Sequence, residues 1–278
     1  MGVIASLAAL RVHVLVVELP GRPVLRLRAE AAVRARGWIV VREPVDADVL
    51  LVCGTPRAAI AEAVDALWWD VPSPRARRTV RAAADLPEVL DSAARVLADG
   101  ALQRRAAADL GEAPPPPPPG RFGPLRPDWP AGLTLDCAAG SDGRIVAVGT
   151  RRSADEPEDD PVPAAALAVA DAARLLRMAG WASPALRLDR VVDLLLAGVP
   201  SERLARRLRS VAGLVRRSGT LRVVLAREAP SVDARARVLA LLAAALAGEG
   251  PPPAPRVLMG APLRSVPMLV AATEPGRG

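Results

Sequence analysis

The chain has 278 residues, 51% of them hydrophobic, which is enough to build roughly two domains with cores of their own. Because the sequence contains no Lys, all 37 basic residues are Arg, and with 30 acidic residues they give a formal net charge of +7. This excess permits an acidic partner. The interspersed Asp and Glu and the near absence of Phe and Tyr argue against a nucleic-acid platform that stacks bases.

The N-terminal segment from Met1 to Val17 is apolar, but Arg11 and His13 interrupt it before it reaches the roughly 20 residues that a membrane span needs. It also lacks the basic start and the cleavage site of a secretion signal. Cys53 and Cys137 are the only cysteines, and their unlike contexts predict neither a disulfide framework nor a metal site. We expect a cytoplasmic protein without a transmembrane segment, metal or cofactor, which partners can hold at the inner face of the cell membrane.

Hydrophobic periodicity predicts alternating strands and helices in the first part of the chain. The expected strands cover residues 11–17, 38–42, 48–53 and 75–80, and the expected helices cover 23–36, 58–69 and 87–98. The run 48–53 is typical of a parallel strand buried on both faces. Pro72 and Pro74 end the second helix, and Asp85 is the expected cap of the third. Residues 1–102 are therefore predicted to form a doubly wound parallel α/β sheet.

Residues 103–122 are predicted to be a linker, since Pro114 to Pro119 favour a stiff polyproline II spacer of roughly 19 Å. Beyond it, apolar segments flank Ser141-Asp142-Gly143, which is a hairpin signal. The later elements are expected as helices at 164–179, 184–197, 201–218 and 232–247 and a strand at 220–227. Residues 123–278 are thus predicted to be a mainly helical α+β domain with an N-terminal β-hairpin.

Two segments of the first domain carry a family pattern. The first runs from Asp46 through the apolar strand to Gly54-Thr55-Pro56, and the second is Trp68-Trp69-Asp70-Val71-Pro72-Ser73-Pro74-Arg75. Together they resemble the central segment of the 20 kDa quinone-site subunit of respiratory complex I and of the small subunit of nickel-iron hydrogenases. The resemblance implies a flavodoxin-like fold. It also places an iron-sulfur ligand cysteine just beyond the next strand, where this chain has Ala83.

The start of the second domain resembles the hairpin of the 49 kDa subunit of complex I and of hydrogenase large subunits. The similarity lies in Gly123-Pro124-Leu125-Arg126-Pro127 and in the two apolar segments joined at Asp142-Gly143. Arg126 stands where the family has His. The resemblance implies a cluster-less fusion of small-subunit and large-subunit pieces. We expect a non-catalytic accessory, assembly or structural subunit of a complex I-like or hydrogenase-like membrane oxidoreductase.

Other functions depend on a few local features. Gly54 and Thr55 end a strand before a helix, where backbone N–H groups could meet a small anion or quinone in an enzyme or binding protein. His13 is interpreted as a core residue, and the acidic segment 155–160 as a solvated connector rather than a cation site. The chain contains no nucleophile elbow, dinucleotide motif or P-loop. We assign no catalytic residue.

The expected helix 201–218 has one apolar stripe and a basic opposite face. Arg203, Arg206 and Arg207 lie on that face, and only Glu202 balances them locally. We predict these three arginines as a partner-binding surface for an acidic protein, with an Arg-rich adaptor for nucleic acid or membrane surface as the alternative. Trp68 and Trp69 are neighbours on one helix and cannot point the same way. We take Trp69 as the second candidate for a partner contact.

Overall fold

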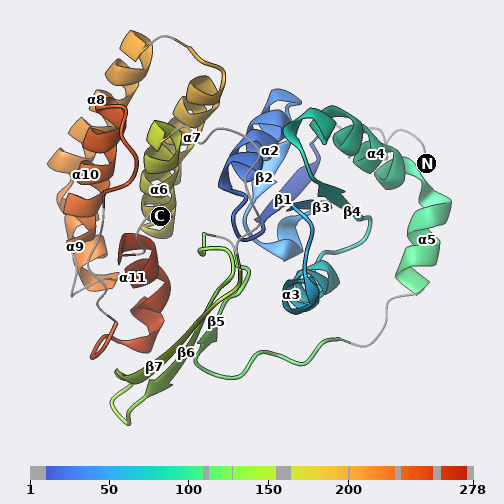
Figure 1. The fold of residues 1–278 in the computed structure, drawn as a ribbon, viewed down its shortest axis with the longest axis horizontal. Coiled ribbons are helices and arrows are strands. Elements are labelled where there is room, and N and C mark those ends of the chain that lie inside the picture. The colour runs from blue at the N-terminus through green and yellow to red at the C-terminus, as the bar shows by residue number, and fades with distance from the viewer. Residues whose placement is uncertain are drawn as a thin grey trace.

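The computed structural model of the chain describes residues 11–108, 113–126, 128–154, 164–199, 201–228, 233–252 and 258–273. A parallel sheet and its helices lie on one side of the molecule, and a group of helices lies on the other (Figure 1). A small antiparallel sheet projects from the region between them (Figure 1). Among the described residues, no helix combines the length and the apolar character needed to cross a membrane.

The first part of the chain forms a four-stranded parallel sheet with the strand order β2-β1-β3-β4. Its strands are β1 (His13–Glu18), β2 (Ile39–Val41), β3 (Val49–Cys53) and β4 (Ala76–Val80). Helices α2 (Pro23–Ala35), α3 (Ala58–Trp69) and α4 (Leu86–Ala98) follow β1, β3 and β4. Every residue of β3 is buried, as expected for a central parallel strand. The predicted α/β fold is confirmed, and its strand order is that of flavodoxin-like sheets.

The two faces of this sheet are covered in different ways. Helices α2 and α4 share an apolar cluster with alternate residues of β1 and β3 on one face. On the other face α3 covers only part of the sheet, because the β2–β3 connection contains a single 3-10 turn (Pro44–Asp46) and no helix. Leu125 and Ala131, which come from the second part of the chain, complete the apolar cluster there. The sheet therefore uses residues beyond the linker to bury its second face.

Helix α5 (Gly100–Ala108) includes the first residues of the predicted linker. The Asp99 carboxylate caps it by accepting the N–H groups of Ala101 and Leu102 at 3.0 Å. Gln103 is buried, and its side-chain amide accepts the Arg75 N–H at 2.8 Å and donates to the Arg75 carbonyl at 3.0 Å. The expectation that the linker begins at residue 103 was therefore wrong. Residues 103–108 are helical and are held beside β4 by Gln103, and the exposed prolines 114–118 have no regular secondary structure.

The predicted hairpin is present as β6 (Leu133–Ala139) and β7 (Ile145–Arg152), and β5 (Arg121–Phe122) adds a third antiparallel strand. Gly123 has a φ of +86°, and a Cβ atom there would lie 1.9 Å from the Leu133 carbonyl oxygen. That oxygen accepts the Trp129 indole N–H at 2.6 Å. Glycine at position 123 thus lets the chain turn tightly around Trp129 and return into β6.

The remaining helices form one group around α6. They are α6 (Ala164–Met178), α7 (Ala182–Leu196), α8 (Ser201–Arg217), α9 (Gly219–Glu228), α10 (Ala234–Leu246) and α11 (Val266–Thr273). Residues Ala168, Ala172 and Leu176 of α6 are fully buried, because α7, α10 and α11 pack around this helix. Leu27 of α2 joins the same apolar cluster, so the core of the second part reaches into the first.

Two local predictions were wrong. Residues 220–227, expected as a strand, belong to helix α9, whose first turn is capped by the Ser218 hydroxyl accepting the Leu221 N–H at 3.0 Å. Asp85 precedes α4, but its side chain makes no capping hydrogen bond. Its backbone already has helical angles as the end of a 3-10 turn (Ala83–Asp85), whereas a capping residue is usually extended. The predicted acidic connector 155–160 lies outside the described residues.

Candidate functional site

Helix α2 carries a buried charged face. Arg26, Glu30 and Arg34 recur at a spacing of four residues, which places them on one side of the helix. The Glu30 carboxylate is 2% exposed and accepts hydrogen bonds from Arg26 at 2.8 Å and from Arg42 at 2.9 Å. Nη1 of Arg34 lies 3.6 Å from its other oxygen. One carboxylate thus lies among three guanidinium groups.

The three arginines determine the ionisation of Glu30. Burial by itself would raise the pKa of Glu30, because the ionised form loses its hydration. Arg42, Arg26 and Arg34 outweigh burial and hold the pKa well below its ordinary range. Glu30 is therefore ionised at neutral pH despite its burial.

Arg34 joins the two parts of the chain. Its guanidinium donates to both oxygens of Asp193 on α7, at 2.9 Å and 2.5 Å, although the two residues are 159 positions apart. Burial lowers the pKa of Arg34, and the hydrogen bonds to Asp193 and the charge of Glu30 more than reverse this. A second contact between the two parts of the chain lies at Gly132 and Pro20. A Cβ atom at position 132 would come within 2.6 Å of the Pro20 ring.

Arg177 of α6 completes this network. Its Nη1 donates to both oxygens of Asp189 at 3.0 Å, and its Nη2 donates to Asp128 at 3.2 Å. Asp128 has a φ of 55°, a left-handed conformation that costs a non-glycine residue on the order of 1 kcal/mol. The ion pair with Arg177 therefore holds a strained residue in place at the contact between the two parts.

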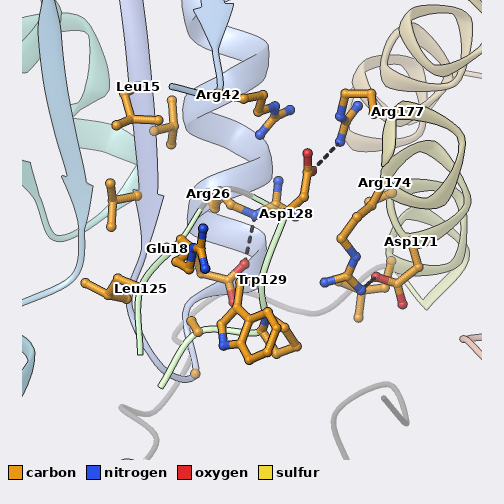
Figure 2. A pocket seen from close by; sticks show the side chains of 18 of the residues that line it. Leu15, Glu18, Arg26, Arg42, Leu125, Asp128, Trp129, Asp171, Arg174 and Arg177 are labelled. Atoms are coloured by element: carbon orange, nitrogen blue, oxygen red, sulfur yellow. Dashed lines mark hydrogen bonds and ion pairs between the residues drawn. The ribbon is translucent and has the colours of Figure 1, made fainter. Parts of the chain in front are cut away.

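A cavity of about 100 Å³ lies beside this network. Its walls come from β1, α2, the end of α3, the residues 125, 126 and 128–131, and α6. Figure 2 shows arginines entering from both sides. The charged residues that line it are Glu18, Arg26, Arg42, Arg126, Asp128, Arg152, Asp171, Arg174 and Arg177. Six arginines and three carboxylates leave an excess of three positive charges. We call this the interface cavity.

The Gly54–Thr55 turn differs from the predicted anion site. Gly54 has a φ of +111°, and its N–H donates to the Val80 carbonyl at 2.8 Å. This hydrogen bond joins the end of β3 to β4, so that N–H is not directed at a ligand. Thr55 is exposed, and α3 begins three residues later at Ala58. Neither residue lines the interface cavity.

The two tryptophans at the end of α3 are both half-buried. Trp68 packs against the apolar cluster of the second sheet face, and the Arg75 guanidinium lies 4.2 Å from the centre of its ring. Arg75 also donates to the carbonyls of Trp68 and Val71, so it holds the connection from α3 to β4. The role of Trp69 in a partner contact stays a prediction, because the contacts of Trp68 and Arg75 do not test it.

Helix α8 has the amphipathic arrangement that its sequence predicts. Leu204, Leu208, Val211 and Val215 are buried in the helical group. The arginines of the opposite face, Arg203, Arg206, Arg207, Arg209, Arg216 and Arg217, are all exposed. None of these six forms an ion pair with another described residue. Figure 1 places α8 at the outer edge of the molecule, away from the parallel sheet.

The other predicted residues lie outside both the interface cavity and the basic face of α8. The His13 ring is 39% exposed, and its Nδ1 lies 3.3 Å from Asp48, so His13 is less buried than expected of a core residue. Ala83 lies directly after β4, in the 3-10 turn before α4. Cys53 and Cys137 are buried in β3 and β6 and are not joined by a disulfide. Among the described residues, no three His, Cys, Asp or Glu side chains gather as a metal site.

The interface cavity was not predicted, although one signal for it is visible in the sequence. Charged residues at positions 26, 30 and 34 alternate with the apolar positions of α2, and such spacing indicates a salt-bridged helix face. Which face of α2 is buried depends on α6 and α7, which lie more than 120 residues further along the chain. Local periodicity contains no information about that contact.

No family model, curated protein or solved structure matches the chain.

Proposed function

We propose that this protein is a non-catalytic accessory, assembly or structural subunit of a complex I-like or hydrogenase-like membrane oxidoreductase, held on its cytoplasmic side by protein contacts. The parent complex follows from the resemblance of residues 46–75 to the small subunits, and the parallel sheet in this segment agrees with it. Ala83 replaces the ligand cysteine of the family pattern, which supports binding rather than electron transfer.

The unbalanced basic face of α8 is the observation on which the proposal depends. The helix cannot turn this face inward, because Leu204, Leu208 and Val215 already fill the opposite stripe. Exposed arginines without partners contribute little to stability. They do suit an acidic protein surface, which attracts them at long range and accepts their forked hydrogen bonds.

The test is co-purification of the tagged full-length chain with the membrane oxidoreductase of its host. Reversing Arg203, Arg206 and Arg207 to Glu should lower recovery of the complex about tenfold, because three attractive charges become repulsive. Recovery with the wild-type chain should fall as the salt concentration rises, since exposed charges are screened. The matched control reverses Arg81, Arg104 and Arg105, which are equally exposed and lie by β4 and on α5.

Wild-type recovery of the α8 variant across the salt series, or equal loss with the control variant, would contradict the proposal. Capture of RNA or anionic vesicles through α8, with no oxidoreductase recovered, would favour the adaptor alternative instead. Iron and acid-labile sulfide should be absent after anaerobic reconstitution. A stoichiometric cluster that is lost in a Cys53→Ser/Cys137→Ser variant would argue for a redox subunit.

A further inference from the structure

Four arginines of the interface cavity, Arg42, Arg126, Arg174 and Arg177, keep N–H donors without an acceptor among the described residues. Arg42 uses only Nη1, which donates to Glu30. Arg174 donates through Nη2 to Asp171 at 2.5 Å, while its buried Nε has no hydrogen-bond partner. Arg126 is exposed, and among the described residues its guanidinium contacts only the Phe122 ring, at 5.9 Å. Buried donors are nearly always paired in folded proteins, so the buried, unpaired Nε atoms of Arg174 and Arg177 beside one cavity point to an acceptor there.

At the cavity, Arg26 pairs with two carboxylates, and so does Arg177 through its Nη atoms. Arg26 donates to Glu18 and Glu30, and Arg177 donates to Asp128 and Asp189. Figure 2 shows Arg42, Arg177 and Arg174 extending toward the same space from opposite sides, with Asp128 between them. These paired arginines hold the walls in place, and the unused donors of Arg42, Arg126 and Arg174 remain available to a ligand.

The carboxylates at the cavity do not prevent an anion from entering. Glu18 lies 2.8 Å from Arg26, Asp128 lies 3.2 Å from Arg177, and Asp171 lies 2.5 Å from Arg174. Each of these carboxylates is thus matched by an adjacent guanidinium. Glu30 and Asp189 behind the wall neutralise part of the remaining charge, and the six lining arginines still outnumber the five carboxylates near them. Leu15, Val17 and Leu125 give part of the lining an apolar surface, beside which a charge is attracted more strongly than in bulk water.

The size of the cavity limits the ligand. The volume of about 100 Å³ has room for a small molecule together with a few waters. Sites for nucleotides, flavins and other drug-sized ligands start at about 300 Å³. The cavity is therefore suited to an anion of a few heavy atoms, and guanidinium groups bind the planar or tetrahedral oxygens of carboxylates and phosphates in a forked geometry.

We propose that the interface cavity binds a small oxyanion, inorganic phosphate or a short dicarboxylate, through Arg42, Arg126 and Arg174. The ligand lies where the second face of the parallel sheet meets α6. It therefore contacts residues from both parts of the chain. This site is separate from the basic face of α8 and does not depend on the identity of the partner complex.

Titration calorimetry of the full-length chain with potassium phosphate and with malonate tests the proposal, at an ionic strength held constant with chloride. At least one probe should bind saturably with a Kd of about 1 mM or tighter. Arg126→Gln should weaken that binding about tenfold, because it removes a charged hydrogen-bond donor that supports no other described contact than the Phe122 ring. The double variant Arg174→Gln/Asp171→Asn removes the second donor and neutralises its carboxylate partner.

Arg104→Gln is the matched control, because Arg104 is exposed on α5 and does not line the cavity. Its affinity should equal that of the wild type. Saturable binding of one probe identifies the ligand as phosphate or carboxylate, and binding of both supports a general oxyanion site. Absence of saturable binding, or unchanged affinity in the Arg126→Gln variant, overturns the proposal even if the double variant does not fold.

Discussion

Glu30 organises the arginines on the first side of the contact. It lies 2.8 Å from Arg26 and 2.9 Å from Arg42, and Arg34 reaches from it to Asp193 on the other side. Without this carboxylate, three guanidinium groups would be close together with one fewer negative charge among them. The cost of an uncompensated buried charge greatly exceeds the net gain from the original pair. Glu30 is thus expected to contribute to stability through the arginines that it neutralises.

Glu30→Gln should lower the free energy of unfolding by about 3 kcal/mol. The substitution keeps the shape of the side chain but removes the charge that compensates the arginines. Urea unfolding at pH 7, followed by circular dichroism, measures the change. Glu62→Gln provides the control, because Glu62 is exposed on α3 and should change stability by less than about 0.5 kcal/mol.

The same pair of variants predicts a pH dependence. Because the folded chain holds the pKa of Glu30 below its unfolded value, the unfolded chain binds the proton first as the pH falls. The stabilisation is complete above about pH 5 and is lost progressively below it. The gap in stability between wild type and Glu30→Gln should therefore narrow between about pH 5 and pH 2. A gap that stays constant over this range would show that the charge of Glu30 is not responsible.

Among the elements, those with strong local patterns could be predicted and those that depend on distant contacts could not. The buried strand β3 and the helix α3 between Arg57 and Asp70 follow from continuous apolar character and from helical spacing. Residues 220–227 contain β-branched and aliphatic residues that favour a strand, but the Ser218 cap and the buried Leu221 place them in a helix. Helix α5 was missed because Gln103, which holds it in place, forms its hydrogen bond with the backbone of Arg75, 28 residues earlier in the chain.

Gln103→Leu should destabilise the chain by about 2 kcal/mol. The substitution keeps the buried volume but leaves the Arg75 N–H and carbonyl without their partners, and each unsatisfied buried group carries a desolvation cost. Urea unfolding measures the loss, and faster hydrogen exchange of the Arg75 amide would locate it. Arg104→Ala on the exposed side of α5 should be nearly neutral. Equal stability of Gln103→Leu and wild type would mean that α5 is not fastened at this point.

At the scale of the whole molecule, the two parts of the chain share one contact surface rather than only a connecting segment. Leu125 and Ala131 complete a sheet face of the first part, and Leu27 enters the core of the second. The composition and the proline run predicted two parts and a spacer. The pairing of Arg34 with Asp193 could not be predicted, because the hydrophobic pattern of each part specifies a buried face but not its partner. The interface cavity was missed for the same reason.

This arrangement predicts that the two parts stay together when the chain between them is cut. Replacing the exposed residues 115–118 with a protease site should give, after cleavage, two fragments that co-elute in size-exclusion chromatography and separate only in denaturant. Arg34→Ala should weaken their association about tenfold, because Asp193 loses a forked ion pair that is only partly exposed. Arg36→Ala is the control, since Arg36 pairs with Asp91 within the first part. Fragments that elute separately without denaturant would show that the proline segment, and not the contact surface, holds the molecule together.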